Sequence, residues 1–447
     1  MIKSKYLYSA NLAKSLDKTT KQDRRFSVVL FFMLAWVYLQ IIAVLEPLPA
    51  PYLSVALQLK NASGIVVAVV GTILYFQYIR LNKFAFFPLV FSIFTLTSYL
   101  LGSLRYSYVS LADLYLILMY FLWSWVIFVL SPVIFDSYKK VKMFLKWAIL
   151  GTGLIFVSGW GWSVFAGVEV TQVFGGSRAG AERYSFGFRN VGYIGSVLVS
   201  LASGATFLYA LATHNRTRFS WSIVAILSLV VMLMTDSRSY MVFIAVVWFV
   251  YLILNSRYSM LIMYISGFGL IALFLWVDKT FLQAVNPFQQ INFYSSGRLL
   301  IWQTSIQRTM ESITTILVGL GSSPGWRTTF FTLSGEEIIK PFQRFAADNV
   351  FVEMFSLYGL IGLTLFLLSI FRVINAGVSL VRDDEQNSLT KSALSVAVGV
   401  VVAMLVSGVT SSTMPSMGNL LNAILLFVAV PIIVNSAEEG PLQHQNK

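Results

Sequence analysis

The stretch SSGRLLIW, residues Ser295–Trp302, lies inside a polar window that runs from Asp278 to Asp348. This window is the only extended break in an otherwise apolar sequence. Hydrophobic residues make up 57% of the chain, charged residues make up 11%, and the mean hydropathy is +0.75. Soluble domains are about half apolar and about a quarter charged. The composition therefore predicts an all-α polytopic membrane protein, in which the window separates two groups of membrane spans.

The composition also excludes several kinds of chemistry. The chain has no cysteine, which excludes disulfides and thiolate metal sites, and its 2 histidines leave little for a histidine-based metal site or triad. No pair of carboxylates has the DxD-like spacing of a metal site. We therefore expect a metal-independent protein without a cofactor. In a membrane protein the net charge of +13 first reflects loops that set orientation, so we expect no nucleic-acid partner.

Apolar runs long enough to cross a bilayer predict about twelve spans. They lie near 26–45, 63–79, 84–103, 114–134, 143–162, 191–213, 219–235, 239–254, 259–277, 349–371, 393–411 and 417–435. The expected organisation is a cytoplasmic tail (1–25), nine spans with an outer loop at 163–190 (26–277), one large outer loop with short helices (278–348), three further spans (349–435) and a second cytoplasmic tail (436–447). The first span follows a basic segment and lacks a small-residue cleavage site, so we expect it to be retained.

Short basic loops set the orientation. The loops YKKVK (Tyr138 to Lys142) and NRTR (Asn215 to Arg218) fall on the same side as the basic N-terminal tail. The positive-inside rule makes this side cytoplasmic, so both termini are expected there. The window and the loops near 46–62 and 163–190 then face outward.

The outward-facing loops carry an unusual kind of positive charge. They contain nine arginines and three lysines, although a topology signal needs only positive charge. Arginine offers a planar fork that binds phosphate or carboxylate through two hydrogen bonds. The alternative is that these arginines reach toward lipid headgroups. Because they cluster in three loops beside glycine and serine, the pattern favours recognition of phosphate.

The window itself predicts a short helix. Ser295 or Ser296 is a suitable cap for a helix through about Glu311, with Arg298 in its first turn, where free backbone N–H groups favour an anion. Such a helix lies on the membrane surface or covers a cavity.

Four polar segments fall on the outer side in a fixed order. They are SRAGAERYSFGFRN (Ser177 to Asn190), TDSRS (Thr235 to Ser239), SSGRLLIW with the downstream GLGSSPGWR (Gly319 to Arg327), and ADN (Ala347 to Asn349). Together they resemble the O-antigen ligase and polymerase superfamily, membrane glycosyltransferases with a GT-C-like helical fold. The resemblance covers roughly the second half of the chain.

The matching positions can be given motif by motif. They are Arg183, Gly187 and Asn190 before a span, Ser237-Arg238 at a tight turn, Ser296-Gly297-Arg298 with Trp302 and Gly319-Leu320-Gly321, and Asp348-Asn349 before a span containing Gly359-Leu360-Ile361-Gly362. Ligases of the superfamily usually carry histidine where this chain has Asp348. That departure favours the branch of O-antigen repeat-unit polymerases.

The resemblance implies transfer of a growing glycan from undecaprenyl pyrophosphate to a sugar hydroxyl of an incoming lipid-linked repeat unit. The reaction would take place at the periplasmic face of the bacterial inner membrane. Arg298 and Arg238 are expected to stabilise the pyrophosphate leaving group, and Asp348 to act as general base. With one credible carboxylate, displacement with inversion is the simpler course. Residues expected to bind pyrophosphate or glycan are Arg183, Arg189, Arg178, Asn190, Ser237, Trp302, Arg327, Arg344 and Asn349.

Several of these residues could instead have a purely structural role. Asp348 precedes a span and has the side chain of a good helix cap, and Glu353 is a reserve carboxylate one turn inside that span. Trp302 either stacks on sugar or belongs to the interfacial aromatic belt. Arg327 and Arg344 are either binding residues or ordinary loop surface.

Other functions also remain open. One is a ligase that transfers the glycan to lipid A core, and a remoter one is a flippase or transporter of lipid-linked oligosaccharides. The expected partners are undecaprenyl pyrophosphate-linked oligosaccharides, membrane lipids, and a chain-length regulator and a flippase of the same pathway.

Overall fold

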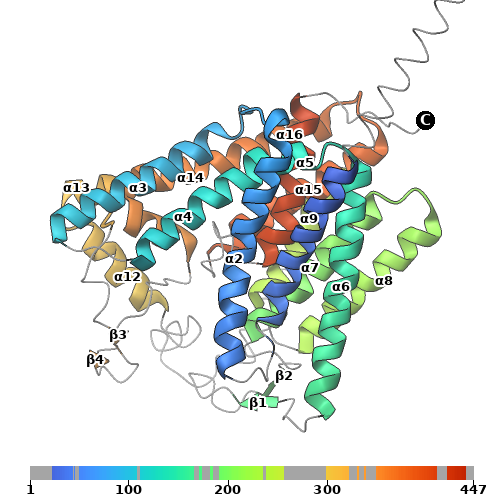
Figure 1. The fold of residues 1–447 in the computed structure, drawn as a ribbon, viewed down its shortest axis with the longest axis horizontal. Coiled ribbons are helices and arrows are strands. Elements are labelled where there is room, and N and C mark those ends of the chain that lie inside the picture. Colours follow the sequence, from blue (N-terminus) through green and yellow to red (C-terminus); the bar gives the residue numbers. More distant parts are fainter. Residues whose placement is uncertain are drawn as a thin grey trace, which may run out of the picture.

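The computed structural model describes residues 23–43, 45, 50–107, 111–165, 171–173, 182–184, 191–234, 238–255, 298–321, 330–331, 337–338, 349–409 and 420–438. Most of this part of the chain is helical (Figure 1). The helices are Asp23–Ile42, α2 (Ala50–Tyr75), α3 (Phe86–Tyr106), α4 (Leu111–Trp125), α5 (Ser131–Ile134), α6 (Tyr138–Phe165), α7 (Val191–Ala210), α8 (Asn215–Met234), α9 (Arg238–Asn255), α12 (Arg298–Thr309), α13 (Ile313–Val318), α14 (Val350–Arg382), α15 (Ser388–Ser407) and α16 (Phe427–Glu438).

Shorter elements complete the description. A 3-10 turn, η1 (Phe76–Tyr78), follows α2, and two π-helical segments, η2 (Val126–Leu130) and η4 (Asn422–Leu426), lead into α5 and α16. Four short strands form two antiparallel pairs: β1 (Thr171–Val173) pairs with β2 (Glu182–Tyr184), and β3 (Phe330–Phe331) pairs with β4 (Glu337–Ile338).

The helices have the length and composition of membrane spans. In the described part of the chain, 7 helices are long and apolar enough to cross a membrane: Asp23–Ile42, Gln58–Tyr78, Phe86–Arg105, Leu114–Ile134, Tyr138–Trp162, Val350–Arg382 and Ser388–Ser407. Three shorter helices, Ile194–Ala210, Tyr240–Asn255 and Asn422–Glu438, are also apolar. The expectation of an α-helical membrane protein is confirmed at this level.

The helix boundaries correct several predicted loops. α2 begins at Ala50, so the predicted loop at 46–62 is wrong from residue 50 onward; Pro51 does not prevent this, because the first turn of a helix tolerates proline. NRTR forms the first turn of α8 rather than a loop. α8 itself is neither one of the 7 candidate spans nor one of the three shorter apolar helices. α14 continues past the predicted end at 371 to Arg382. The predicted span at 259–277 lies outside the described residues.

α3 and α14 run antiparallel in close contact. The Phe91 ring lies 6.1 Å from the ring of Tyr358 and 5.9 Å from that of Phe366. Further along, the Arg372 guanidinium lies over the ring of Phe87. Figure 1 shows α3, α4 and α14 side by side, leaning away from the group that contains α6, α7 and α8. This pair of helices carries α12 and α13, which belong to the polar window.

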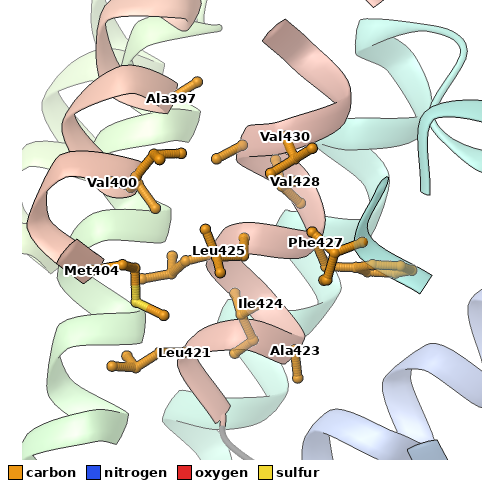
Figure 2. Close-up of a cluster of buried hydrophobic side chains, with 14 of the residues drawn as sticks. Ala397, Val400, Met404, Leu421, Ala423, Ile424, Leu425, Phe427, Val428 and Val430 are labelled. Atoms are coloured by element: carbon orange, nitrogen blue, oxygen red, sulfur yellow. The ribbon is translucent and has the colours of Figure 1, made fainter. Parts of the chain in front are cut away.

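The apolar core extends through most of the described helices, and one dense part of it lies where α15 meets η4 and α16. Figure 2 shows Val400 and Met404 of α15 facing Leu421 and Leu425 across this interface. On the other side Phe427 packs edge to face against Trp36, at 5.9 Å between ring centroids. Ring contacts of Phe427 with Phe135 and Phe144 extend the core to α5 and α6.

Candidate functional site

The predicted site residues divide into two groups. Arg183, Arg238, Arg298, Trp302 and Asn349 belong to described elements. Seven others lie outside the described residues: Asp348, Arg178, Arg189, Asn190, Ser237, Arg327 and Arg344.

Three of the described residues stand where a helix begins. Arg238 is the first residue of α9, Arg298 is the first residue of α12, and Asn349 is the cap of α14. Backbone N–H groups at such positions favour negative charge. Arg183 has a different setting, in the middle of β2 opposite Gln172. Trp302 is partly buried in the second turn of α12.

Close helix contacts bring several of these starting points to one end of the bundle. Gly195 of α7 lies against the ring of Tyr240 in α9, and Gly399 of α15 lies against the backbone of Val247 in α9. Val350 N–H at the start of α14 donates to the carbonyl of Gly408 at the end of α15, at 2.7 Å.

The positions of these contacts show how far the ends of α9 and α15 lie from their point of contact. Arg238 precedes Val247 by nine residues and Gly408 follows Gly399 by nine, which is about 13 Å along each antiparallel helix. The starts of α9 and α14 therefore lie at the same level, with the start of α7 beside α9. α12 also packs on α14, which connects the helix of Arg298 to the helix of Asn349.

The cap of α14 is Asn349 and not Asp348. The Asn349 side-chain oxygen accepts from the backbone N–H groups of Phe351, at 2.9 Å, and Val352, at 3.1 Å. The alternative role of Asp348 as helix cap is therefore wrong, because the capping position lies one residue later. Two adjacent residues with similar capping preference cannot be separated by their sequence alone.

Glu353 is the described carboxylate nearest to this helix start. It lies in the first turn of α14, is only 3% exposed, and its backbone N–H donates to the carbonyl of Asn349. A carboxylate there is favoured by the positive end of the helix dipole. Ionisable residues inside membrane helices are functional candidates by default, so Glu353 keeps its place as the reserve carboxylate.

The Gly-Leu-Gly turn of the window meets a break in α14. Gly359, with φ +64° and ψ −166°, interrupts the helix, and Gly319 and Gly321 also have positive φ angles of +80° and +57°. A Cβ on Gly359 would collide with the carbonyl oxygen of Leu317, and one on Gly319 would collide with that of Leu357. Glycine is therefore required by both backbone angle and space.

The turn supplies the hydrogen bonds that the break removes. In an unbroken helix the carbonyls of Ser356 and Leu357 would accept from residues four positions later. Here Leu320 N–H donates to Ser356 and Gly321 N–H donates to Leu357, each at 2.9 Å. The Ser98 hydroxyl of α3 donates to the carbonyls of Val318 and Leu357, at 2.5 and 3.1 Å. The turn is thus a structural junction between three helices.

A second contact holds the other end of α13 to α3. Ser312 caps α13 and forms a reciprocal capping box with Thr315. Arg105, in the last turn of α3, donates to the Ser312 hydroxyl at 3.4 Å. Arg105 is one of the nine arginines in the outward-facing loops, but it was not predicted as a site residue. Its contact with Ser312 could not be predicted because the two residues are more than two hundred positions apart.

The described ranges contain no group of three or more histidine, cysteine, aspartate or glutamate side chains arranged to hold a metal ion. In comparisons with known proteins, no protein-family model and no curated protein matches the chain.

Gly359→Ala tests the junction. The added Cβ meets backbone atoms that cannot rotate away, and the backbone angles of Gly359, which essentially only glycine adopts, cost a further 1–3 kcal/mol or so. We expect a large fall in the apparent Tm of the detergent-purified protein, measured by tryptophan fluorescence. Gly161→Ala in α6 is the matched control, since its Cβ would have no neighbour within 4 Å. Equal Tm values for the two variants would contradict the junction.

Proposed function

We propose that the protein is an O-antigen or related surface-polysaccharide polymerase. It transfers a growing glycan from undecaprenyl pyrophosphate to a sugar hydroxyl of an incoming lipid-linked repeat unit. It acts at the periplasmic face of a bacterial inner membrane through about twelve spans in a GT-C-like arrangement, with both termini cytoplasmic. The observation that carries this proposal is the ordered set of polar motifs, which resembles the polymerase branch of the superfamily.

The helix alignment supports the proposal. The motif residues Arg238 and Asn349 begin helices whose starts lie at one level, and the start of α7 directly follows Asn190. A pyrophosphate anchored in lipid meets a protein at such helix ends, near the membrane surface. Arginine forks and backbone N–H groups would there stabilise the charge of the leaving group.

The proposed reaction is a single displacement. The Asp348 carboxylate takes the proton of the acceptor hydroxyl, whose oxygen attacks the anomeric carbon of the donor sugar. The bond from that carbon to the pyrophosphate oxygen breaks, and undecaprenyl pyrophosphate leaves with the electron pair. Attack from the opposite face inverts the anomeric configuration. The leaving group is already acidic, so charge stabilisation serves it better than protonation. Because Asn349 caps α14, the Asp348 carboxylate is not needed for the cap.

A glycolipid gel of cells that lack the gene tests the class of reaction. We expect long chains to disappear while a single repeat unit remains attached to lipid, because a ligase would still transfer unpolymerised units. Loss of every attached repeat, with accumulation of carrier-linked polymer, would instead identify a ligase. An unchanged ladder would reject both reactions.

Arg298→Lys tests recognition by the arginine fork. Lysine keeps the positive charge but loses the paired donors, so we expect transfer to fall about 100-fold, the loss typical for one group that stabilises transition-state charge. Complementation of the deletion strain, with membrane insertion checked by immunoblot, measures the effect. Arg308→Lys in the last turn of the same helix is the control and should keep normal chain lengths. Normal lengths with Arg298→Lys would reject the role of the fork.

A further inference from the structure

α13 lies alongside the outer part of α3 and points back into the helix bundle. Its cap Ser312 contacts Arg105 at the end of α3, whereas its last residue, Val318, accepts from Ser98. Residue numbers therefore rise along α13 as they fall along α3, and the two helices are antiparallel. The Gly-Leu-Gly turn then lies deeper in the bundle than the start of α13.

Two long apolar helices give the distance of this turn from a helix end. Ser98 lies seven residues before Arg105 in α3, which corresponds to about 10 Å of helix. Leu357, which accepts from Gly321, lies seven residues after Val350 at the start of α14, again about 10 Å. Both helices are among those long and apolar enough to span a membrane. The 21 residues of α3 extend about 31 Å, which matches the 30 Å or so of a bilayer core, so a turn about 10 Å from the end of α3 lies inside that core.

The local structure satisfies what this depth requires. Irregular backbone is tolerated in a bilayer only where protein covers it and its polar groups are bonded. Gly319 and Gly321 are buried, Leu320 is 5% exposed, and the amide groups of all three residues donate to backbone carbonyls. The backbone donors of the turn are thus satisfied within the protein, as a position inside a bilayer requires.

Among the described residues, the other face of α13 is exposed and largely apolar, with Thr314 as its polar member. Met310, just before it, is 60% exposed, and Ile313 and Leu317 within it are 69% and 41% exposed. The adjoining turn of α3 exposes Leu101 and Leu104, the latter by 80%. Because α13 is hydrogen-bonded to α3 at both ends, the apolar surfaces of the two helices adjoin. A surface continuous with that of a spanning helix meets the same surroundings.

We propose that α13 is a re-entrant helix whose Met310–Ile313–Leu317 face contacts lipid acyl chains of the leaflet that surrounds the Arg105 end of α3. This inference rests on the spans α3 and α14 and not on the proposed enzymatic function. It changes the expected character of the polar window, because part of the window is then anchored within the bilayer. Arg298 begins the helix that leads directly to this anchor, so the window is held at the membrane surface on this side.

Spin labelling of the full chain in liposomes tests the proposal. The chain has no cysteine, so Ile313→Cys and Leu317→Cys each provide a single attachment site without prior removal of native residues. Both side chains are exposed, so the label does not disturb a packed core. Electron paramagnetic resonance then compares collision with oxygen, which dissolves in lipid, and with a water-soluble nickel chelate.

We expect both labels to favour oxygen over the nickel chelate, as Leu104→Cys on α3 should, with Leu317 about 6 Å deeper than Ile313 along the helix. Asp384→Cys, at a fully exposed position between α14 and α15, is the aqueous control. Nickel accessibility at Ile313 and Leu317 equal to that at Asp384 would overturn the proposal. Low accessibility to both reagents would also overturn it, because a protein partner would then cover the face.

Discussion

The arrangement of the polar window depends on the break in α14. A helix interrupted within a membrane must find other partners for the carbonyls that lose their bonds. The break at Gly359 leaves those of Ser356 and Leu357 to be satisfied by the amides of Leu320 and Gly321. The match requires glycine on both sides, since backbone approaches backbone without room for a Cβ. A helix break and a loop turn, each costly alone, thereby stabilise one another.

This junction has consequences for the candidate site. It ties α12 and α13 to α14, whose capped start lies level with the start of α9 and is bonded to the end of α15. Arg238 and Arg298, which are proposed to act on pyrophosphate, stand at the starts of α9 and α12. Rigid helix ends hold such groups more accurately than a free loop would. The arrangement thus suits a reaction in which two lipid-anchored substrates meet at the membrane surface.

Hydropathy alone predicted most of the helices, because an apolar run of about twenty residues matches the length of helix that crosses a bilayer. It failed where polar residues continue a helix, as at Gln58 and Lys60 in α2 and at NRTR in α8. The motifs at Gly319 and Gly359 were both visible in the sequence, but their direct contact was not, since no local pattern encodes a partner forty positions away. The cap at Asn349 was missed because Asp348 has the same local preference. The contact of Arg105 with Ser312 could not be predicted for the same reason, since the two residues are far apart in the sequence.

The most direct test of the account is synthesis by the purified protein in liposomes supplied with a lipid-linked repeat unit and no other enzyme. The account predicts that the wild-type chain elongates the repeat into longer lipid-linked oligomers and releases undecaprenyl pyrophosphate. Asp348→Asn should fold with the same Tm, since Asn349 caps α14, and should form no oligomers. Absence of elongation by folded wild-type protein, or full elongation by Asp348→Asn, would contradict it.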